Sequence, residues 1–218
     1  ESMDLRLKGM RVVVSGATKG IGRAVAEAMA DEGANVSICA RDAGEVEATV
    51  AALSGRGVTA FGQACDVADA AALKSWVAAS AAQLGGLDIV IANVSALALG
   101  GDEDSWRKSF EVDLMHSVRM VEAAMPFLEQ SMAASVVTVS SVSGREIDFA
   151  AGPYGAFKAA LIHYTQGLAF QLADKGIRAN TVSPGNTYFE GGVWQQIEKG
   201  NPDFFKQALA MNPTGRMA

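Results

Sequence analysis

Short runs of apolar, often β-branched residues alternate along the chain with longer segments whose apolar residues recur at helical spacing. A short apolar run is typical of a buried strand, whereas spacings of three and four residues predict an amphipathic helix. The predicted strands are 10–15, 35–40, 58–64, 87–92, 135–140 and 177–182. The predicted helices are 20–32, 42–53, 68–84, 102–132 and 155–175.

Strands that alternate with helices and are apolar on both faces predict a parallel sheet covered on both sides. The expected fold class is therefore α/β, a doubly wound, Rossmann-type parallel sheet with helices on both faces. The 218 residues, half of them hydrophobic, suit one domain over 4–218. Pro126 is expected to end or kink its helix, and 186–205 is expected to be a mobile loop with a short helix. Residues 1–3 are interpreted as left over from expression.

The charge and cysteine content narrow the classes of function. A net charge of -6 disfavours nucleic acid, whose binding requires a surplus of Lys and Arg. The sequence contains no run of 18 apolar residues, so it predicts no membrane span. Cys39 and Cys65 form no CxxC motif and are expected to be buried thiols in a reducing cytoplasm. His116 and His163 lack partners at metal-ligand spacing, so no metal site is expected.

A glycine-rich segment with the spacing Gly-x-x-x-Gly-x-Gly joins the first predicted strand to the first predicted helix. Glycines permit a tight turn and a close approach of the backbone to a pyrophosphate, which the amides at the helix N-terminus can bind. Such a segment can also be an ordinary turn, but its position between strand and helix favours a dinucleotide. The predicted cofactor-binding residues here are Gly16, Thr18, Lys19, Gly20, Ile21 and Gly22.

Arg41 follows the second predicted strand, where dinucleotide folds usually place an acidic residue on the ribose 2′-hydroxyl. A guanidinium suits a 2′-phosphate, and Lys19 can add a second charge. Both side chains could instead be solvated surface cations. We favour NADP over NAD, and expect Asp66 and Val67 to border the adenine.

Tyr154 and Lys158 are one helical turn apart on one helix face. Ser141 follows the fifth predicted strand, at the end of a parallel sheet where ligands bind. The alternative reading is an aromatic residue at a helix start beside a solvated lysine.

Taken together, these motifs resemble the classical short-chain dehydrogenase/reductase family, and most closely its 3-oxoacyl-carrier-protein reductase branch. The resemblance covers about residues 7–218. The residues that carry it are Gly16, Gly20, Gly22, Asp66, Asn93, Ser141, Tyr154, Lys158, Pro184, Gly185 and Thr187.

The resemblance implies a role for each of these side chains. Tyr154 would be the general acid or base, with Ser141 holding the substrate oxygen and Lys158 gripping the nicotinamide ribose. A free phenol has a pKa of about 10, which Lys158 and an oxidised nicotinamide are expected to lower. Asn93 would contact the cofactor. Pro184, Gly185 and Thr187 would border the nicotinamide.

The chain departs from the family in three places. Val94 and Ser95 replace part of the family's Asn-Asn-Ala-Gly, so the loop is expected to take a different path. Asp113 stands where the family has an asparagine that holds a proton-relaying water, and is either a relay residue or a buried helix polar group. The chain also stops at Ala218, short of the family's last helix and strand. We favour a longer protein shown incompletely over a true truncation.

The expected substrate is a ketone, an alcohol or an acyl thioester with a hydrophobic body. The expected assembly, from the resemblance, is a homotetramer or homodimer through the long helices. A protein that binds NADP as a redox sensor without turnover is the alternative. The residues expected to line the substrate pocket are Leu97, Leu99, Ser143, Ile147, Phe149, Tyr188 and Trp194.

Overall fold

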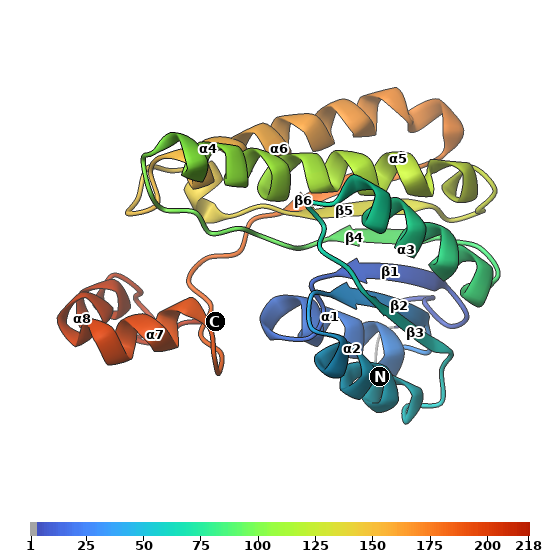
Figure 1. Cartoon of the computed structure of the whole chain (residues 1–218), viewed down its shortest axis with the longest axis horizontal. Coiled ribbons are helices and arrows are strands. Elements are labelled where there is room, and N and C mark those ends of the chain that lie inside the picture. Colours follow the sequence, from blue (N-terminus) through green and yellow to red (C-terminus); the bar gives the residue numbers. More distant parts are fainter. Residues whose placement is uncertain (1–3) are drawn as a thin grey trace.

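The computed structural model describes residues 4–218, so the interpretation of residues 1–3 lies outside the described part of the chain. Six parallel strands form one sheet in the order β3-β2-β1-β4-β5-β6 (Figure 1). The order reverses direction between β1 and β4, which leaves a crevice at the carboxyl ends of these strands. The strands are β1 (Arg11–Ser15), β2 (Asn35–Ala40), β3 (Ala60–Ala64), β4 (Ile89–Ala92), β5 (Ser135–Val139) and β6 (Arg178–Val182).

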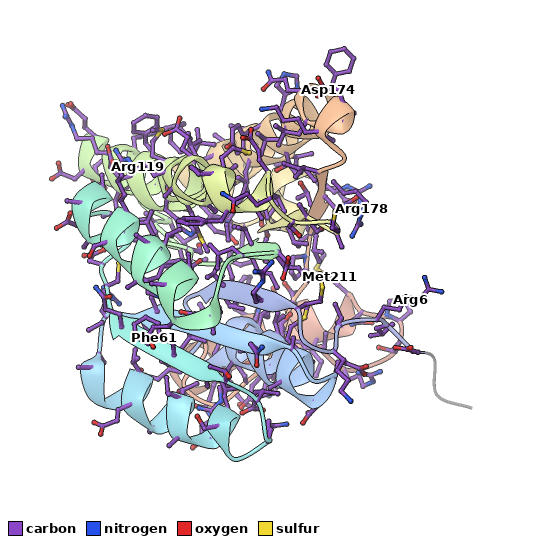
Figure 2. All side chains as sticks on the ribbon, turned by 90° about the vertical axis from the view of Figure 1, so that its right-hand side faces the viewer. Arg6, Phe61, Arg119, Asp174, Arg178 and Met211 are labelled. Carbon is purple, nitrogen blue, oxygen red and sulfur yellow. The ribbon has the colours of Figure 1, made fainter. Side chains whose placement is uncertain are left out.

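Helices cover both faces of the sheet, as Figure 1 shows, and the expected fold class is confirmed. Neighbouring residues of one strand enter opposite layers: Val13 packs in the layer under α3, α5 and α6, while Val12 and Val14 pack in the layer under α1 and α2. Figure 2 shows side chains filling both layers. The labelled Asp174 lies at the outer edge of the helical layer that contains α6. The helices are α1 (Gly20–Asp31), α2 (Ala43–Ser54), α3 (Ala70–Leu84), α4 (Glu103–Ser109), α5 (His116–Leu128), α6 (Pro153–Gln171), α7 (Val193–Gly200) and α8 (Pro202–Ala210).

The long helical stretch predicted over 102–132 is helical from α4 to α5 but not uniformly so. Between these helices, Phe110–Met115 forms a π-helical turn, a wide turn that often marks a functional site. Asp113 lies in this turn and is fully buried. Pro126 lies inside α5, near the end of the helix at Leu128.

The segment after Pro184 differs from the expectation of a loop with one short helix. Two helices, α7 and α8, form there and pack on each other away from the sheet (Figure 1). Trp194, Ala208 and Met217 are the buried residues of this small cluster. Each helix is about two turns long, too short for its apolar spacing to be recognised in the sequence.

Cys39 and Cys65 are both buried, and neither forms a disulfide within residues 4–218, as expected for core thiols. Within the described residues, no helix combines the length and apolarity needed to cross a bilayer.

Candidate active site

The carboxyl ends of the central strands meet around a cleft of about 310 Å³. The predicted residues Ser141, Tyr154 and Lys158 all line it, although they come from different elements. Parallel strands bring these ends to one edge of the sheet, which explains the meeting. The other predicted residues that line this cleft are Lys19, Ile21, Gly22, Asn93, Pro184, Gly185 and Thr187.

The first turn of α6 positions the tyrosine and the lysine. Pro153 begins this helix, where a proline loses no hydrogen bond, and Tyr154 follows it. One turn later the Lys158 ammonium lies 5.8 Å from the centre of the Tyr154 ring. Lys158 is buried and donates from Nζ to the carbonyl of Val139 at 2.9 Å.

Asp113 lies behind Lys158 rather than in the cleft. Its Oδ1 is 3.5 Å from Lys158 Nζ and accepts a hydrogen bond from the amide of Ala96 at 3.2 Å. Burial lowers the pKa of Lys158, and the charge of Asp113 opposes this shift. Asp113 Oδ2 is buried without a hydrogen-bond partner among the described residues.

Ser141 belongs to a short chain of hydroxyl groups at the cleft. Its Oγ donates to Ser143 Oγ at 3.3 Å, and Ser143 Oγ donates to Asp148 Oδ2 at 2.6 Å. The neighbouring Ser140 is buried, and its Oγ donates to the carbonyl of Lys158 at 2.7 Å. The two adjacent serines therefore serve different purposes: Ser140 ties β5 to α6, and Ser141 faces the cleft.

The pKa of the Tyr154 phenol is raised, whereas the sequence led us to expect it to be lowered. Burial is the largest cause, and the negative charge of Asp113 adds to it. Hydrogen bonding to Ser141 and Ser95 acts in the opposite direction. In the protein alone, burial of the phenol and the nearby carboxylate outweigh the groups that favour a phenolate. The lowering by Lys158 together with an oxidised nicotinamide stays a prediction for the complex with the cofactor.

The glycine loop is as tight as its spacing predicts. A Cβ on Gly22 would lie 2.2 Å from the carbonyl oxygen of Gly16, so no side chain fits there. Asn93 Nδ2 donates to the carbonyls of Ser15 and Gly16, both at 3.1 Å, and fixes the loop to the end of β4. No side chain among residues 4–218 caps the N-terminus of α1, a position at which backbone amides can bind an anion.

A second cleft of about 650 Å³ continues from the first toward the end of β2. Residues shared by both clefts, among them Lys19 and Asn93, connect Tyr154 at one end with Arg41 at the other. Such an elongated site suits a dinucleotide. The predicted cofactor-binding residues that line the second cleft are Gly16, Thr18, Lys19, Arg41, Asp66, Val67 and Asn93.

Gly20 lines neither cleft, because the ring of Phe189 covers it. A Cβ on Gly20 would lie 2.6 Å from that ring. Phe189 itself lines both clefts and was not anticipated from the sequence. Ser95 also lines both and was noticed only as a departure from the family pattern.

Of the seven residues expected to line the substrate pocket, four line the first cleft and three do not. Leu97, Ser143, Phe149 and Trp194 line the first cleft. Leu99, Ile147 and Tyr188 do not; the Ile147 side chain is 90% exposed. For Ile147 the reason is that the loop after β5 directs this side chain to solvent, although Phe149 of the same loop lines the cleft.

His116 is fully buried in the core. Its Nε2 lies 2.9 Å from Ser15 Oγ, and its Nδ1 lies 3.0 Å from the carbonyl of Val112. Burial lowers its pKa to about 4, so the ring is neutral near pH 7. It thereby links the π-helical turn to the end of β1.

Comparison with known proteins adds independent information. Residues 10–199 match the family described as short chain dehydrogenase. Isoepoxydon dehydrogenase patN of Penicillium expansum is 39% identical over 218 residues, covering 97% of this chain and 83% of the relative. Dehydrogenase/reductase SDR family member 4 of Rattus norvegicus is 32% identical, covering 94% of this chain and 75% of the relative.

A solved structure resembles the whole arrangement of strands and helices. The short chain dehydrogenase of Burkholderia cenocepacia in complex with NADP superimposes with a TM-score of 0.81 at 32% identity. The match covers 89% of this chain and 83% of that one. A relative with this fold therefore binds NADP.

Proposed function

Because the chain belongs to the short chain dehydrogenase family and is an oxidoreductase, we propose that it transfers a hydride between NADP(H) and a carbonyl or secondary alcohol. The observation that carries this proposal is the continuous cleft from Tyr154, flanked by Ser141 and Lys158, to Arg41. A site with a proton donor at one end and a cation at the other suits the nicotinamide and the 2′-phosphate of one cofactor.

The residues present fit the cofactor, because Gly16 and Gly22 line the two clefts without side chains and no described side chain caps the N-terminus of α1. The amides that begin α1 would hold the pyrophosphate, Arg41 the 2′-phosphate, and Asp66 with Val67 the adenine. Pro184, Gly185 and Thr187 would border the nicotinamide. When bound, the nicotinamide supplies or accepts the hydride.

Tyr154 moves the proton. In reduction its Oη donates to the carbonyl oxygen of the substrate, and in oxidation its phenolate accepts the proton of the alcohol. Ser141 holds the same oxygen and fixes its direction. Lys158 supplies a positive charge beside the phenol, and Asp113 stabilises the charged form of Lys158 and belongs to the proton relay.

The lining of the first cleft supports a substrate with a hydrophobic body. Leu97, Phe149 and Trp194 are apolar, while Ser143 offers one hydroxyl beside Ser141. Ketones, secondary alcohols and 3-oxoacyl thioesters are the substrate classes that we propose.

The proposal includes assembly into a homodimer or homotetramer. Trp106 and Phe110 are partly exposed and pack with Phe157 into an aromatic cluster on α4, the π-helical turn and α6. Size-exclusion chromatography with light scattering measures the mass; a monomer at micromolar concentration would contradict the assembly but not the activity.

The decisive experiment follows the loss of NADPH absorbance against a panel of ketones that includes a 3-oxoacyl thioester. Tyr154→Phe is expected to lower turnover at least about a hundredfold while NADPH affinity is kept. Tyr164→Phe, on the same helix, is the matched control and should retain activity. Tight NADPH binding without turnover of any ketone would instead favour the redox sensor.

A further inference from the structure

The side chain of Glu45 holds two residues of the glycine loop at the mouth of the second cleft. Glu45 Oε1 lies 2.5 Å from Lys19 Nζ, and Thr18 Oγ1 donates to Glu45 Oε2 at 3.1 Å. The carboxylate comes from the first turn of α2, where Asp42 caps the helix by accepting from the amide of Glu45 at 2.8 Å. The partner of Lys19 in this structure is therefore a carboxylate of the protein itself.

Glu45 carries its charge at neutral pH. Its hydrogen bond with Lys19 is the largest cause that lowers its pKa below the usual value, and Thr18 acts in the same direction. Both partners are in contact with solvent: 62% of the Lys19 side chain and 37% of the Glu45 side chain are exposed. An exposed pair of this kind is weak enough to exchange partners.

The charges around this end of the cleft balance. Lys19 and Arg41 are positive, Asp42 and Glu45 are negative, and all four residues line the same cleft. A ribose with a free 2′-hydroxyl is neutral and leaves the pair between Lys19 and Glu45 intact. A 2′-phosphate is an anion and competes with Glu45 for the Lys19 ammonium.

We propose that Glu45 reduces the preference for NADPH over NADH, because a 2′-phosphate must take Lys19 from it whereas a 2′-hydroxyl need not. The inference rests on the proposed function, since it assumes that a nicotinamide dinucleotide binds in this cleft. The wild-type protein accordingly binds both dinucleotides with only a modest preference for NADPH. Glu45 is a specificity residue that weakens the binding of the phosphorylated cofactor alone.

The test is a titration of the wild-type protein and of Glu45→Gln with NADPH and with NADH at low ionic strength. Glutamine keeps the size of the side chain and removes its charge. NADPH is expected to bind Glu45→Gln about two- to fivefold more tightly, the range of one exposed ion pair. NADH should bind both proteins equally.

Glu47→Gln is the matched control. Glu47 is exposed on the same helix two residues further on, and it lines neither cleft. The substitution changes the net charge by the same amount. It should leave both affinities unchanged.

Two fragments of the cofactor locate the effect. Adenosine 2′,5′-bisphosphate carries the 2′-phosphate without a nicotinamide, and adenosine 5′-monophosphate lacks that phosphate. Glu45→Gln should gain affinity only for the bisphosphate. More salt should reduce this gain, because ions screen exposed charges.

The outcomes separate the inference from the proposed function. Tight NADPH binding by the wild type with no gain in Glu45→Gln would overturn the inference alone. Equal gains for NADPH and NADH, or the same gain in Glu47→Gln, would also overturn it by showing a general effect of charge. A wild-type protein that binds neither dinucleotide would overturn the proposed function together with the inference.

Discussion

Lys158 Nζ lies 3.5 Å from Asp113 Oδ1, and the two side chains are 2% and 0% exposed. A buried ammonium is costly without an opposite charge nearby, and Asp113 provides that charge from the π-helical turn. Lys158 Nζ lies 5.8 Å from the centre of the Tyr154 ring, and the carboxylate of Asp113 raises the pKa of Tyr154. The pH dependence of any chemistry at the phenol therefore depends on a residue that lies outside the cleft.

Asp113→Asn is expected to shift the pH profile to lower values. Removing the carboxylate removes a cause that raises the pKa of Tyr154, so the phenolate forms at lower pH. The measurement is kcat/KM for alcohol oxidation against pH, which reports groups of the free enzyme. Asp104→Asn, exposed on α4, is the control. A profile that moves to higher pH would contradict this prediction and show that Asp113 acts on the phenol mainly by keeping Lys158 charged.

Ser95→Ala is expected to shift the same profile the opposite way. The Ser95 hydroxyl lowers the pKa of Tyr154 by hydrogen bonding, so its loss should raise the pKa and delay phenolate formation to higher pH. Because Asp113→Asn and Ser95→Ala have opposite signs, a common effect of loosened packing cannot imitate both. Shifts in the same direction for the two variants would contradict the assignment of Ser95.

Gly22→Ala is expected to impair dinucleotide binding. Its Cβ would lie 2.2 Å from the Gly16 carbonyl oxygen and 2.5 Å from Asn93 Nδ2, so the loop backbone must move. We expect NADPH affinity to fall at least about tenfold, with about 1–3 kcal/mol of lost stability from overpacking. Fluorescence titration and thermal unfolding measure the two effects.

Gly167→Ala is the control for this substitution. Gly167 lies inside α6, and a Cβ there would meet no atom within 4 Å. Alanine has a higher helix propensity than glycine, so this variant should be up to about 1 kcal/mol more stable than the wild type. It should bind NADPH normally. Normal binding by Gly22→Ala would contradict the role of the tight loop.

Asp88→Asn is expected to reduce the free energy of unfolding and to make that free energy depend less on pH. Asp88 accepts from the Nε and Nη2 of Arg11, both at 2.7 Å, and from Ser131 Oγ at 2.5 Å. Burial raises the pKa of Asp88, but these hydrogen bonds outweigh it and the pKa is lowered.

A carboxylate whose pKa is lower in the folded protein than in the unfolded chain stabilises the fold. This stabilisation is complete at pH values above the pKa of the unfolded chain, about 3.9 for Asp, and is lost as the pH falls through the pKa of the folded protein. Asp88→Asn should cost about 1–3 kcal/mol at pH 7. Chemical denaturation at pH 7 and near pH 3 measures the difference. An equal loss at both pH values would show that the carboxylate charge contributes nothing.

Much of the site could be predicted because its residues lie in local patterns. The glycines from Gly16 to Gly22 follow a strand directly, and Tyr154 and Lys158 share one helix face. Each of these patterns spans only a few neighbouring residues and can be recognised without the fold. Helix 193–200 was not recognised separately from 202–210, because two turns carry too little periodicity. The exposure of Ile147 was missed because loop direction depends on packing elsewhere in the chain.

The sequence by itself determined the alternation of strands and helices, the tight glycine turn and the residue types at the cleft. Only the tertiary structure decided that Glu45 holds Lys19, that Phe189 covers Gly20 and that Asp113 and Ser95 act on Tyr154 in opposite directions. The physical reason is distance along the chain. Periodicity and turn chemistry act between near neighbours, whereas charge and burial act between groups that only the folded sheet brings together.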